Sequence, residues 1–248
     1  MRDRRNTEQD SEREGIFRMD FYDFRVYAFC ALLGYLVGGI NPAFLISKLK
    51  GFDIRKRGSG NAGASNAAVL MGRRIGLLCG IFDILKAFCV MEICMHLFWY
   101  YDMVGILTGV CCILGHIFPL QLCFRGGKGL AALGGVAMAY NLKLFLFLLL
   151  IELLVVLIID YIVAVPITGS IIFSVILAVT GGIWCGLMFL PAVVAILVKH
   201  KENLLRIRYG VEARFSFLWN KENDRRRVEY NWNRLSDAQK RNMKEVYR

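Results

Sequence analysis

Uncharged apolar runs divide this chain into segments long enough to cross a membrane. No Asp, Glu, Lys or Arg occurs in residues 26–46, 103–124 or 161–198, which are runs of 21, 22 and 38 residues. About 20 helical residues, at about 1.5 Å each, cross the roughly 30 Å hydrocarbon layer of a bilayer. The longest run therefore predicts two helices, with a turn at Gly181-Gly182 and Pro191 nearby.

Three shorter apolar segments complete the predicted set. One is residues 75–100, which is interrupted by three charged residues, and the others are residues 130–139 with their flanks and residues 144–159 around Glu152. Together the runs predict an all-α integral membrane protein with about seven transmembrane helices and no large soluble domain. The expected organisation is a mixed-charge N-terminal extension (1–23), a membrane domain (24–212) and a basic cytoplasmic tail (213–248).

Charge is distributed unevenly between the loops. The net charge of +11 would suggest a nucleic-acid partner in a soluble protein, but seven Lys/Arg and one acid lie in residues 48–74, and five more Lys/Arg lie in residues 199–214. The loops expected on the opposite side hold almost nothing basic. Because basic loops stay in the cytoplasm, we expect an external N-terminus, a cytoplasmic C-terminus and no nucleic-acid partner. The expected location is the inner (plasma) membrane.

The N-terminus and the cysteines give no sign of processing or metal binding. The first 22 residues lack an apolar core, so we expect a disordered segment rather than a cleaved signal peptide, with the first span acting as the insertion signal. All eight cysteines lie in or beside apolar segments, without a CxxC pair and histidines at metal spacing. We interpret them as small packing residues and expect neither a metal nor a cofactor.

The first polar motif follows the first span and reads DIRKRGSGNAGASN from residue 53 to residue 66. Glycines at 58, 60 and 63 permit tight turns that expose backbone N–H groups, and neutral donors lie beside three cations. These are the features of a phosphate-binding loop. The alternative is a Gly-rich loop whose basic residues only set the topology. The candidate phosphate-binding residues are Arg55, Ser59, Gly60, Asn61 and Asn66.

The second motif reads GHIFP at residues 115–119 and FRGGKG at residues 124–129. Glycines around Lys128 make a flexible loop that can surround an anion, although the spacing is not that of a Walker A loop. His116 lies within the apolar run, so it is equally well interpreted as a neutral packing residue. The candidates here are Gly126, Gly127, Lys128 and Gly129.

The third motif, HKENLLRIRYGVE from residue 200 to residue 212, ends the last span. If the helix continues, His200, Asn203 and Arg206 lie on one face, one turn apart. A juxtamembrane basic helix on anionic lipid would explain the Lys and Arg residues, but not Asn203 or Glu212. The predicted topology places all three motifs at cytoplasmic helix ends, where they could meet at one phosphorylated ligand.

With these motifs in this order, residues 36–212 resemble the PlsY family of acyl-phosphate:glycerol-3-phosphate acyltransferases. The resemblance implies transfer of a fatty acyl group from acyl phosphate to the 1-hydroxyl of sn-glycerol 3-phosphate, the first step of bacterial phospholipid synthesis, and a functional link to a soluble enzyme that makes acyl phosphate. It implies that Arg55, Lys128, His200 and Asn203 are catalytic, that the glycine loop holds glycerol 3-phosphate, and that Glu212 is structural.

Two departures from the family pattern and two other functions remain open. Gly39 stands where many members have serine, and Ser65 where threonine is usual. A transporter of a phosphorylated metabolite is the main alternative, although transporters usually bind at the midplane between repeated halves, and no repeat is evident. An inactive lipid-binding homologue is the other. The HxxxxD signature of acyl-CoA-dependent acyltransferases is absent, because Leu120 and Gln121 follow His116 at that spacing.

Overall fold

The computed structural model describes residues 21–218, 220–241 and 243, and every regular element in this part of the chain is helical. The long helices are α2 (Phe21–Gly38), α5 (Arg73–Leu97), α6 (Val104–Ile117), α7 (Leu130–Tyr140), α8 (Leu142–Ile159), α9 (Ala164–Thr180) and α10 (Ile183–Arg208). Shorter elements connect them or follow them: α3 (Pro42–Leu49), η1 (Ile54–Lys56), α4 (Ala64–Met71), η2 (Leu120–Leu122), η3 (Phe215–Leu218), α11 (Lys221–Asn233) and α12 (Asp237–Arg241).

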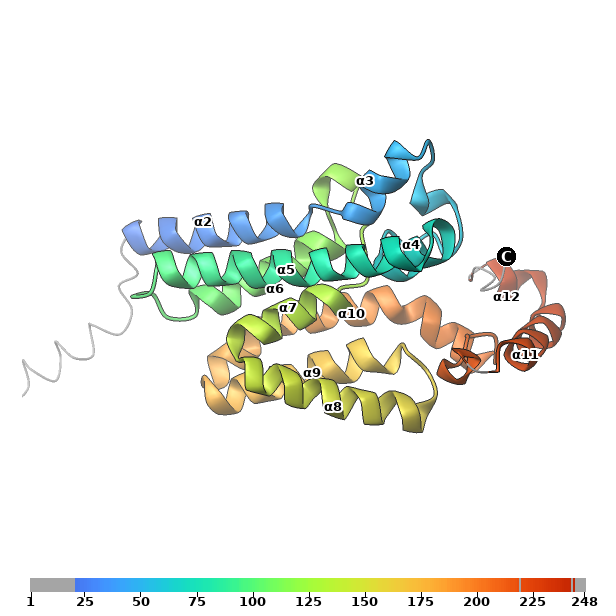
Figure 1. The fold of residues 1–248 in the computed structure, drawn as a ribbon. Coiled ribbons are helices and arrows are strands. Elements are labelled where there is room, and N and C mark those ends of the chain that lie inside the picture. Colours follow the sequence, from blue (N-terminus) through green and yellow to red (C-terminus); the bar gives the residue numbers. More distant parts are fainter. Residues whose placement is uncertain (1–20, 219, 242, 244–248) are drawn as a thin grey trace, which may run out of the picture.

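The long helices lie side by side and alternate in direction along the bundle (Figure 1). Contacts join α2 to α6, α5 to α7, and α9 to α10, while α8 packs on α7 and α9. The beginning of α2 lies at one end of the bundle, and the end of α10 lies at the other, near α3, α4 and α11 (Figure 1). The loops that carry the three polar motifs therefore gather at a single end.

The first predicted span is not one continuous helix, which corrects the sequence interpretation. The chain leaves α2 at Gly38 and starts α3 at Pro42. Asn41 caps α3 by accepting a hydrogen bond from the Phe44 amide at 2.8 Å, and proline fits the first helical position because its missing N–H would have no partner there. The break lets the backbone turn at the end of the bundle where the first motif begins.

Small residues bring the helix backbones close together. A side chain at Gly38 would overlap the Cys112 carbonyl group, and one at Gly115 would overlap the backbone of Tyr35. Such close approach is the usual way in which membrane helices pack, because apolar side chains gain little by leaving lipid. The α9–α10 side of the core is filled by Phe173 and Phe189, whose rings meet edge to face with centroids 5.1 Å apart.

Four helical segments are long and apolar enough to cross a membrane: Asp23–Leu49, Val104–Leu122, Leu142–Ile159 and Ile183–Arg208. Two shorter apolar helices, α7 and α9, accompany them. The predicted turn at Gly181-Gly182 is confirmed, since α9 ends at Thr180 and α10 begins at Ile183. The all-helical membrane architecture therefore agrees with the sequence prediction at this coarser level.

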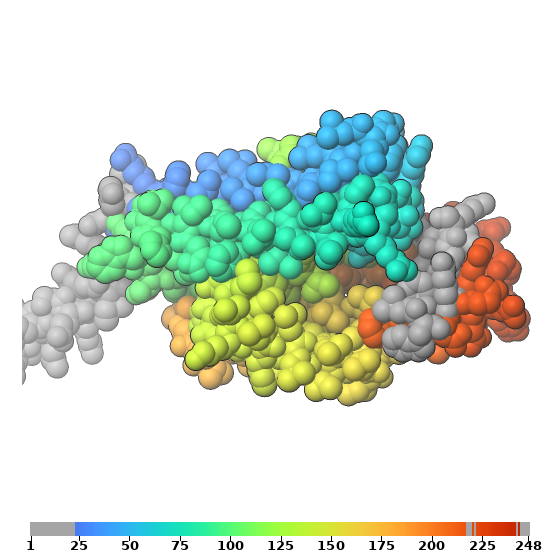
Figure 2. Space-filling view, in the orientation of Figure 1, coloured from blue at the N-terminus to red at the C-terminus, as the bar shows by residue number. Residues whose placement is uncertain are grey.

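The two ends of the chain are described to different extents. Helix α2 includes residues 21–23, and the rest of the segment expected to be disordered lies outside the described residues. The tail contains η3, α11 and α12, which form a lobe at the end of the bundle in Figure 2. This lobe is folded against the end of α10 through the buried residues Val211 and Val228.

Candidate active site

The first loop is organised around an ion pair between Arg55 and Asp53. Asp53 begins η1, and its carboxylate accepts hydrogen bonds from the Arg55 guanidinium at 2.8 and 3.0 Å. These bonds from Arg55 hold the pKa of Asp53 down, to about 2, against the opposing effect of burial. Arg55 also donates to the Leu122 carbonyl oxygen at 2.7 Å, so it ties the first motif to the second.

The buried side chain of Asn66 stabilises the conformation of the first loop. Its side-chain amide donates to the carbonyl oxygens of Ile54, Arg57 and Asn61 at 3.0–3.2 Å, and its oxygen accepts from the Ser59 amide at 3.1 Å. These contacts engage both ends of a buried side chain. Asn66 therefore acts in this structure as a support for the loop, while Ser59 remains exposed at its tip.

The second loop is a compact turn between α6 and α7. The amides of Gly126 and Gly127 donate to the carbonyl oxygens of Ile117 and His116 at 3.2 and 3.0 Å. A side chain at Gly127 would overlap the His116 imidazole, and Gly129 has a φ of +91°, which favours glycine. The loop thus needs glycine at these positions, and it presents Lys128 from a fixed backbone.

Lys128 is held by the third motif. Its ammonium donates to the Asn203 side-chain oxygen at 2.6 Å, and the Asn203 amide donates to the Glu212 carboxylate at 2.7 Å. Glu212 also accepts from Arg206 at 2.6 Å. Burial lowers the pKa of Lys128, and the positive charge of Arg206 lowers it further, with Glu212 opposing. The result is a largely desolvated cation on a network of charged and amide groups.

His200 lies one turn before Asn203 on the same helix, as the sequence predicts. Its Nδ1 lies 2.8 Å from the Ile196 carbonyl oxygen. Because a carbonyl oxygen only accepts, Nδ1 must carry the proton, which leaves Nε2 of the neutral ring as an acceptor.

A buried group of charged residues beneath the second loop was missed in the sequence analysis. Lys86 pairs with Asp83 at 2.7 Å, lies 3.1 Å from His116 Nδ1, and donates to the Ile40 carbonyl oxygen at 2.6 Å. The sequence signal was present, because two opposite charges three residues apart inside an apolar helix indicate an intramembrane pair. Their partner His116, on α6, could not be identified from spacing.

The structure thus brings most of the predicted residues together. Arg55 reaches the second motif at Leu122, a side chain added at Gly63 would come within 4.0 Å of Gly127, and Lys128 reaches the third motif at Asn203. Ser59 and Gly60 belong to the same loop, and among the described residues their amides donate hydrogen bonds within the first motif, to Asn66 and Arg57. Among the described residues there is no cluster of His, Cys, Asp or Glu that could hold a metal ion.

Fold and loops together define a helical membrane protein with cationic, glycine-rich loops gathered at one end of the bundle. The family model described as "Glycerol-3-phosphate acyltransferase" matches residues 28–210. The glycerol-3-phosphate acyltransferase of Aquifex aeolicus is 35% identical over 189 residues, covering 75% of this chain and 98% of the relative. Glycerol-3-phosphate acyltransferase 2 of Thermotoga maritima is 35% identical over 188 residues, covering 74% and 93%.

Two solved structures are similar to the whole bundle. The glycerol 3-phosphate form of PlsY, an integral membrane glycerol 3-phosphate acyltransferase, has a TM-score of 0.70 and 35% identity, covering 77% of this chain and 96% of that one. The lysophosphatidic acid form has a TM-score of 0.68 and 32% identity, covering 82% and 98%. The chain belongs to the glycerol-3-phosphate acyltransferase family of integral membrane enzymes, and the resemblance read from the three motifs is confirmed.

Proposed function

We propose that this protein transfers a fatty acyl group from acyl phosphate to the 1-hydroxyl of sn-glycerol 3-phosphate, giving lysophosphatidic acid and inorganic phosphate. The observation that carries the proposal is the convergence of Arg55, Lys128 and Asn203 from three distant segments at one end of the bundle. The relatives that bear the acyltransferase name, and the neighbour crystallised with glycerol 3-phosphate and with lysophosphatidic acid, support the choice of substrate.

The reaction needs two phosphorylated molecules to approach each other. Lys128 and Arg55 would hold phosphate groups, and the Gly126–Gly127–Lys128–Gly129 loop would fix the orientation of glycerol 3-phosphate. Ser59, Gly60 and Asn61 would contact phosphate from the first loop, which Asn66 supports. Cations held in place before the substrates arrive also stabilise charge that develops in the transition state.

The chemical step joins the hydroxyl oxygen to the acyl carbon and breaks the bond between that carbon and the phosphate. The hydroxyl proton passes to His200 Nε2 or to an oxygen of the departing phosphate. Because acyl phosphate is already activated, the step calls for no covalent acyl-enzyme. His200→Ala separates the two routes: near-normal turnover would leave only the phosphate as acceptor, whereas a large loss of kcat with unchanged KM would assign the role to His200.

Gly39 bears on the alternative of an inactive homologue. A side chain at Gly39 would overlap the Gln121 side-chain amide, which fills the space beside this glycine. A polar group therefore remains where a serine hydroxyl is usual, which favours the enzyme over the inactive homologue. The location of the motifs at one end of the bundle, rather than at its middle, favours the enzyme over a transporter.

The membrane arrangement that we propose has seven spans, namely α2, α5, α6, α7, α8, α9 and α10. An odd number of crossings and the charge bias of the loops support an external N-terminus, a cytoplasmic C-terminus and a site that faces the cytoplasm of the inner (plasma) membrane. A soluble enzyme that makes acyl phosphate would then supply the donor from the cytoplasm. Fusing a fluorescent reporter to Arg248 tests the orientation, since the reporter folds only on the cytoplasmic side.

The donor assay tests the function directly. Purified protein is given sn-glycerol 3-phosphate with palmitoyl phosphate or with palmitoyl-CoA, and lysophosphatidic acid and phosphate are measured together. The proposal predicts equal amounts of both products from palmitoyl phosphate and none from palmitoyl-CoA. Tight binding of glycerol 3-phosphate without either product would instead favour a transporter or an inactive homologue.

A further inference from the structure

The C-terminal lobe, η3 with α11 and α12, lies outside the residues that the family model matches, which end at residue 210. Arg227 on α11 links this lobe to the turn that follows α10. The guanidinium donates to the carbonyl oxygens of Gly210 and Glu212 at 2.5 and 2.7 Å, and it pairs with Asp224 at 2.7 Å. One lobe residue therefore fixes the backbone on both sides of Val211.

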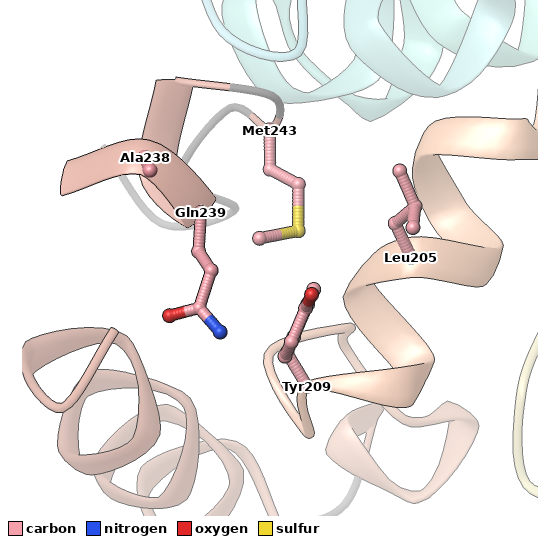
Figure 3. A pocket seen from close by; sticks show the side chains of 5 residues that line it. All are labelled: Leu205, Tyr209, Ala238, Gln239 and Met243. Atoms are coloured by element: carbon pink, nitrogen blue, oxygen red, sulfur yellow. The ribbon is translucent and has the colours of Figure 1, made fainter. Parts of the chain in front are cut away.

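Other residues of the lobe also contact this turn. Asn231 donates to the Gly210 carbonyl oxygen at 2.9 Å, and Val211 is buried against Val228. Met243 lines a small pocket between α12 and the end of α10, together with Leu205 and with Tyr209, which follows α10 (Figure 3). Because Gly210 has a φ of +69°, the chain turns sharply here, and the lobe stabilises that turn.

The Glu212 side chain connects this turn to the proposed active site. The Glu212 carboxylate accepts from Asn203 and Arg206, and Asn203 accepts from Lys128. Hydrogen bonds of 2.6–2.7 Å thus join Arg227 to the backbone carbonyl of Glu212, the Glu212 carboxylate to Asn203, and Asn203 to Lys128. A shift of the Glu212 backbone would move its carboxylate, and with it the support of Lys128.

A second attachment holds the lobe to the bundle independently. Asp160, at the end of α8, accepts hydrogen bonds from the amide and hydroxyl of Ser216 at 2.7 and 2.9 Å, and its carbonyl oxygen accepts from the Phe215 amide at 2.8 Å. The lobe therefore contacts the chain both at the turn that carries Glu212 and at Asp160. A displacement of the lobe would displace this turn as well.

From these contacts we infer that Arg227 is a positioning residue for the acyltransferase site, and that the C-terminal lobe sets the position of Lys128 through Glu212 and Asn203. This role rests on the proposed function, because it concerns the cation that would bind glycerol 3-phosphate. It adds to that function a part of the chain beyond the matched family region.

The experiment compares Arg227→Ala with Arg226→Ala in the full-length protein. Arg226 is a suitable control because it precedes Arg227 on α11, its side chain is 76% exposed against 22% for Arg227, and it pairs only with Glu222 among the described residues. A charge-assisted hydrogen bond contributes more than a neutral one, so we expect Arg227→Ala to raise the KM for glycerol 3-phosphate about three- to tenfold. Arg226→Ala should leave it unchanged, and Arg227→Lys should fall between.

Separate values of KM and kcat distinguish positioning from loss of folded protein. Partial unfolding lowers the apparent kcat but leaves KM for glycerol 3-phosphate unchanged in the remaining enzyme. The same Arg227→Ala change is then made in Glu212→Gln, where the link to Asn203 is already weakened, and should raise KM by less than twofold there.

An equal KM in Arg227→Ala and Arg226→Ala would overturn the inference, as would a full additional effect of Arg227→Ala in Glu212→Gln. Absence of product from wild-type protein with every donor would instead contradict the proposed function. In that case, hydrogen exchange of the backbone amides of residues 210–214 tests the same link without turnover, because Arg227→Ala should speed their exchange and Arg226→Ala should not; equal exchange in both would again overturn it.

Discussion

Lys128 Nζ lies 2.6 Å from Asn203 Oδ1, although 75 positions separate the two residues in the chain. This contact joins the glycine loop after α6 to the face of α10 that also carries His200. Since Asn203 is held in turn by Glu212, the lysine is fixed at its far end as well as by its backbone. A cation restrained in this way can bind a phosphate group with little loss of side-chain entropy.

At Gly127, in the second loop, the His116 imidazole leaves no room for a side chain. Gly127→Ala would force the loop away from His116, and we expect a loss of activity of at least about tenfold, because small displacements of reacting groups reduce rates steeply. Gly134→Ala, on α7, is the matched control, since the nearest atom to an added carbon there is 3.6 Å away. Turnover per folded protein is the measurement, and equal activity of the two variants would contradict the account.

Asn66 is expected to act on the shape of the first loop. Asn66→Ala removes the hydrogen-bond partner of three carbonyl groups and of the Ser59 amide, so we expect destabilisation by about 2–4 kcal/mol and a higher KM for glycerol 3-phosphate. Val69→Ala, an exposed change on the same short helix, should alter neither. Thermal unfolding in detergent and steady-state kinetics test this, and unchanged stability of Asn66→Ala would refute the supporting role.

The pair of Asp83 and Lys86 should show strong coupling. Lys86→Met leaves a buried carboxylate without its partner, which costs about 3–5 kcal/mol, whereas the additional change Asp83→Asn removes that charge and should restore part of the loss. Unfolding of the two single variants and the double variant forms the cycle. If the two effects simply added, these residues would not act as a pair.

The pH dependence of kcat/KM reports on Lys128. Burial lowers the pKa of this ammonium, so Lys128 loses its charge at a lower pH than an ordinary lysine, whose pKa is about 10.4. Activity should therefore begin to fall at a lower alkaline pH than it would with an ordinary lysine. Arginine stays charged throughout, so Lys128→Arg should be slower at its maximum but should keep that activity to higher pH. Spontaneous hydrolysis of the donor is subtracted at each pH. The same alkaline limb in both proteins would show that another group causes it.

Much of this arrangement follows from the sequence, and the exceptions have physical reasons. His200, Asn203 and Arg206 are spaced for one helical face, so their common orientation on α10 was predictable. The helix break at Asn41-Pro42 had local signals, a capping residue followed by proline, but an uninterrupted apolar run concealed it. The contact of Lys86 with His116 depends on how α5 packs on α6, which no spacing within one helix encodes.

The first loop and the tail show a different limit. Asn66 and Asn61 have the same donors and acceptors, so the sequence could not tell which of the two side chains supports the loop. For the tail, the sequence predicted only a basic composition. The contacts of Arg227 with Gly210 and Glu212 could not be predicted, because they depend on the fold of the whole lobe.

The most direct test of the central claim is the turnover of Lys128→Ala beside that of Lys143→Ala, with palmitoyl phosphate and sn-glycerol 3-phosphate as substrates. Both changes remove one lysine, but Lys143 is exposed at the start of α8, at the opposite end of the bundle (Figure 1). We expect a loss of about 10²–10³-fold in kcat/KM for Lys128→Ala and nearly wild-type activity for Lys143→Ala. Comparable activity of the two variants would contradict a phosphate-binding site at Lys128.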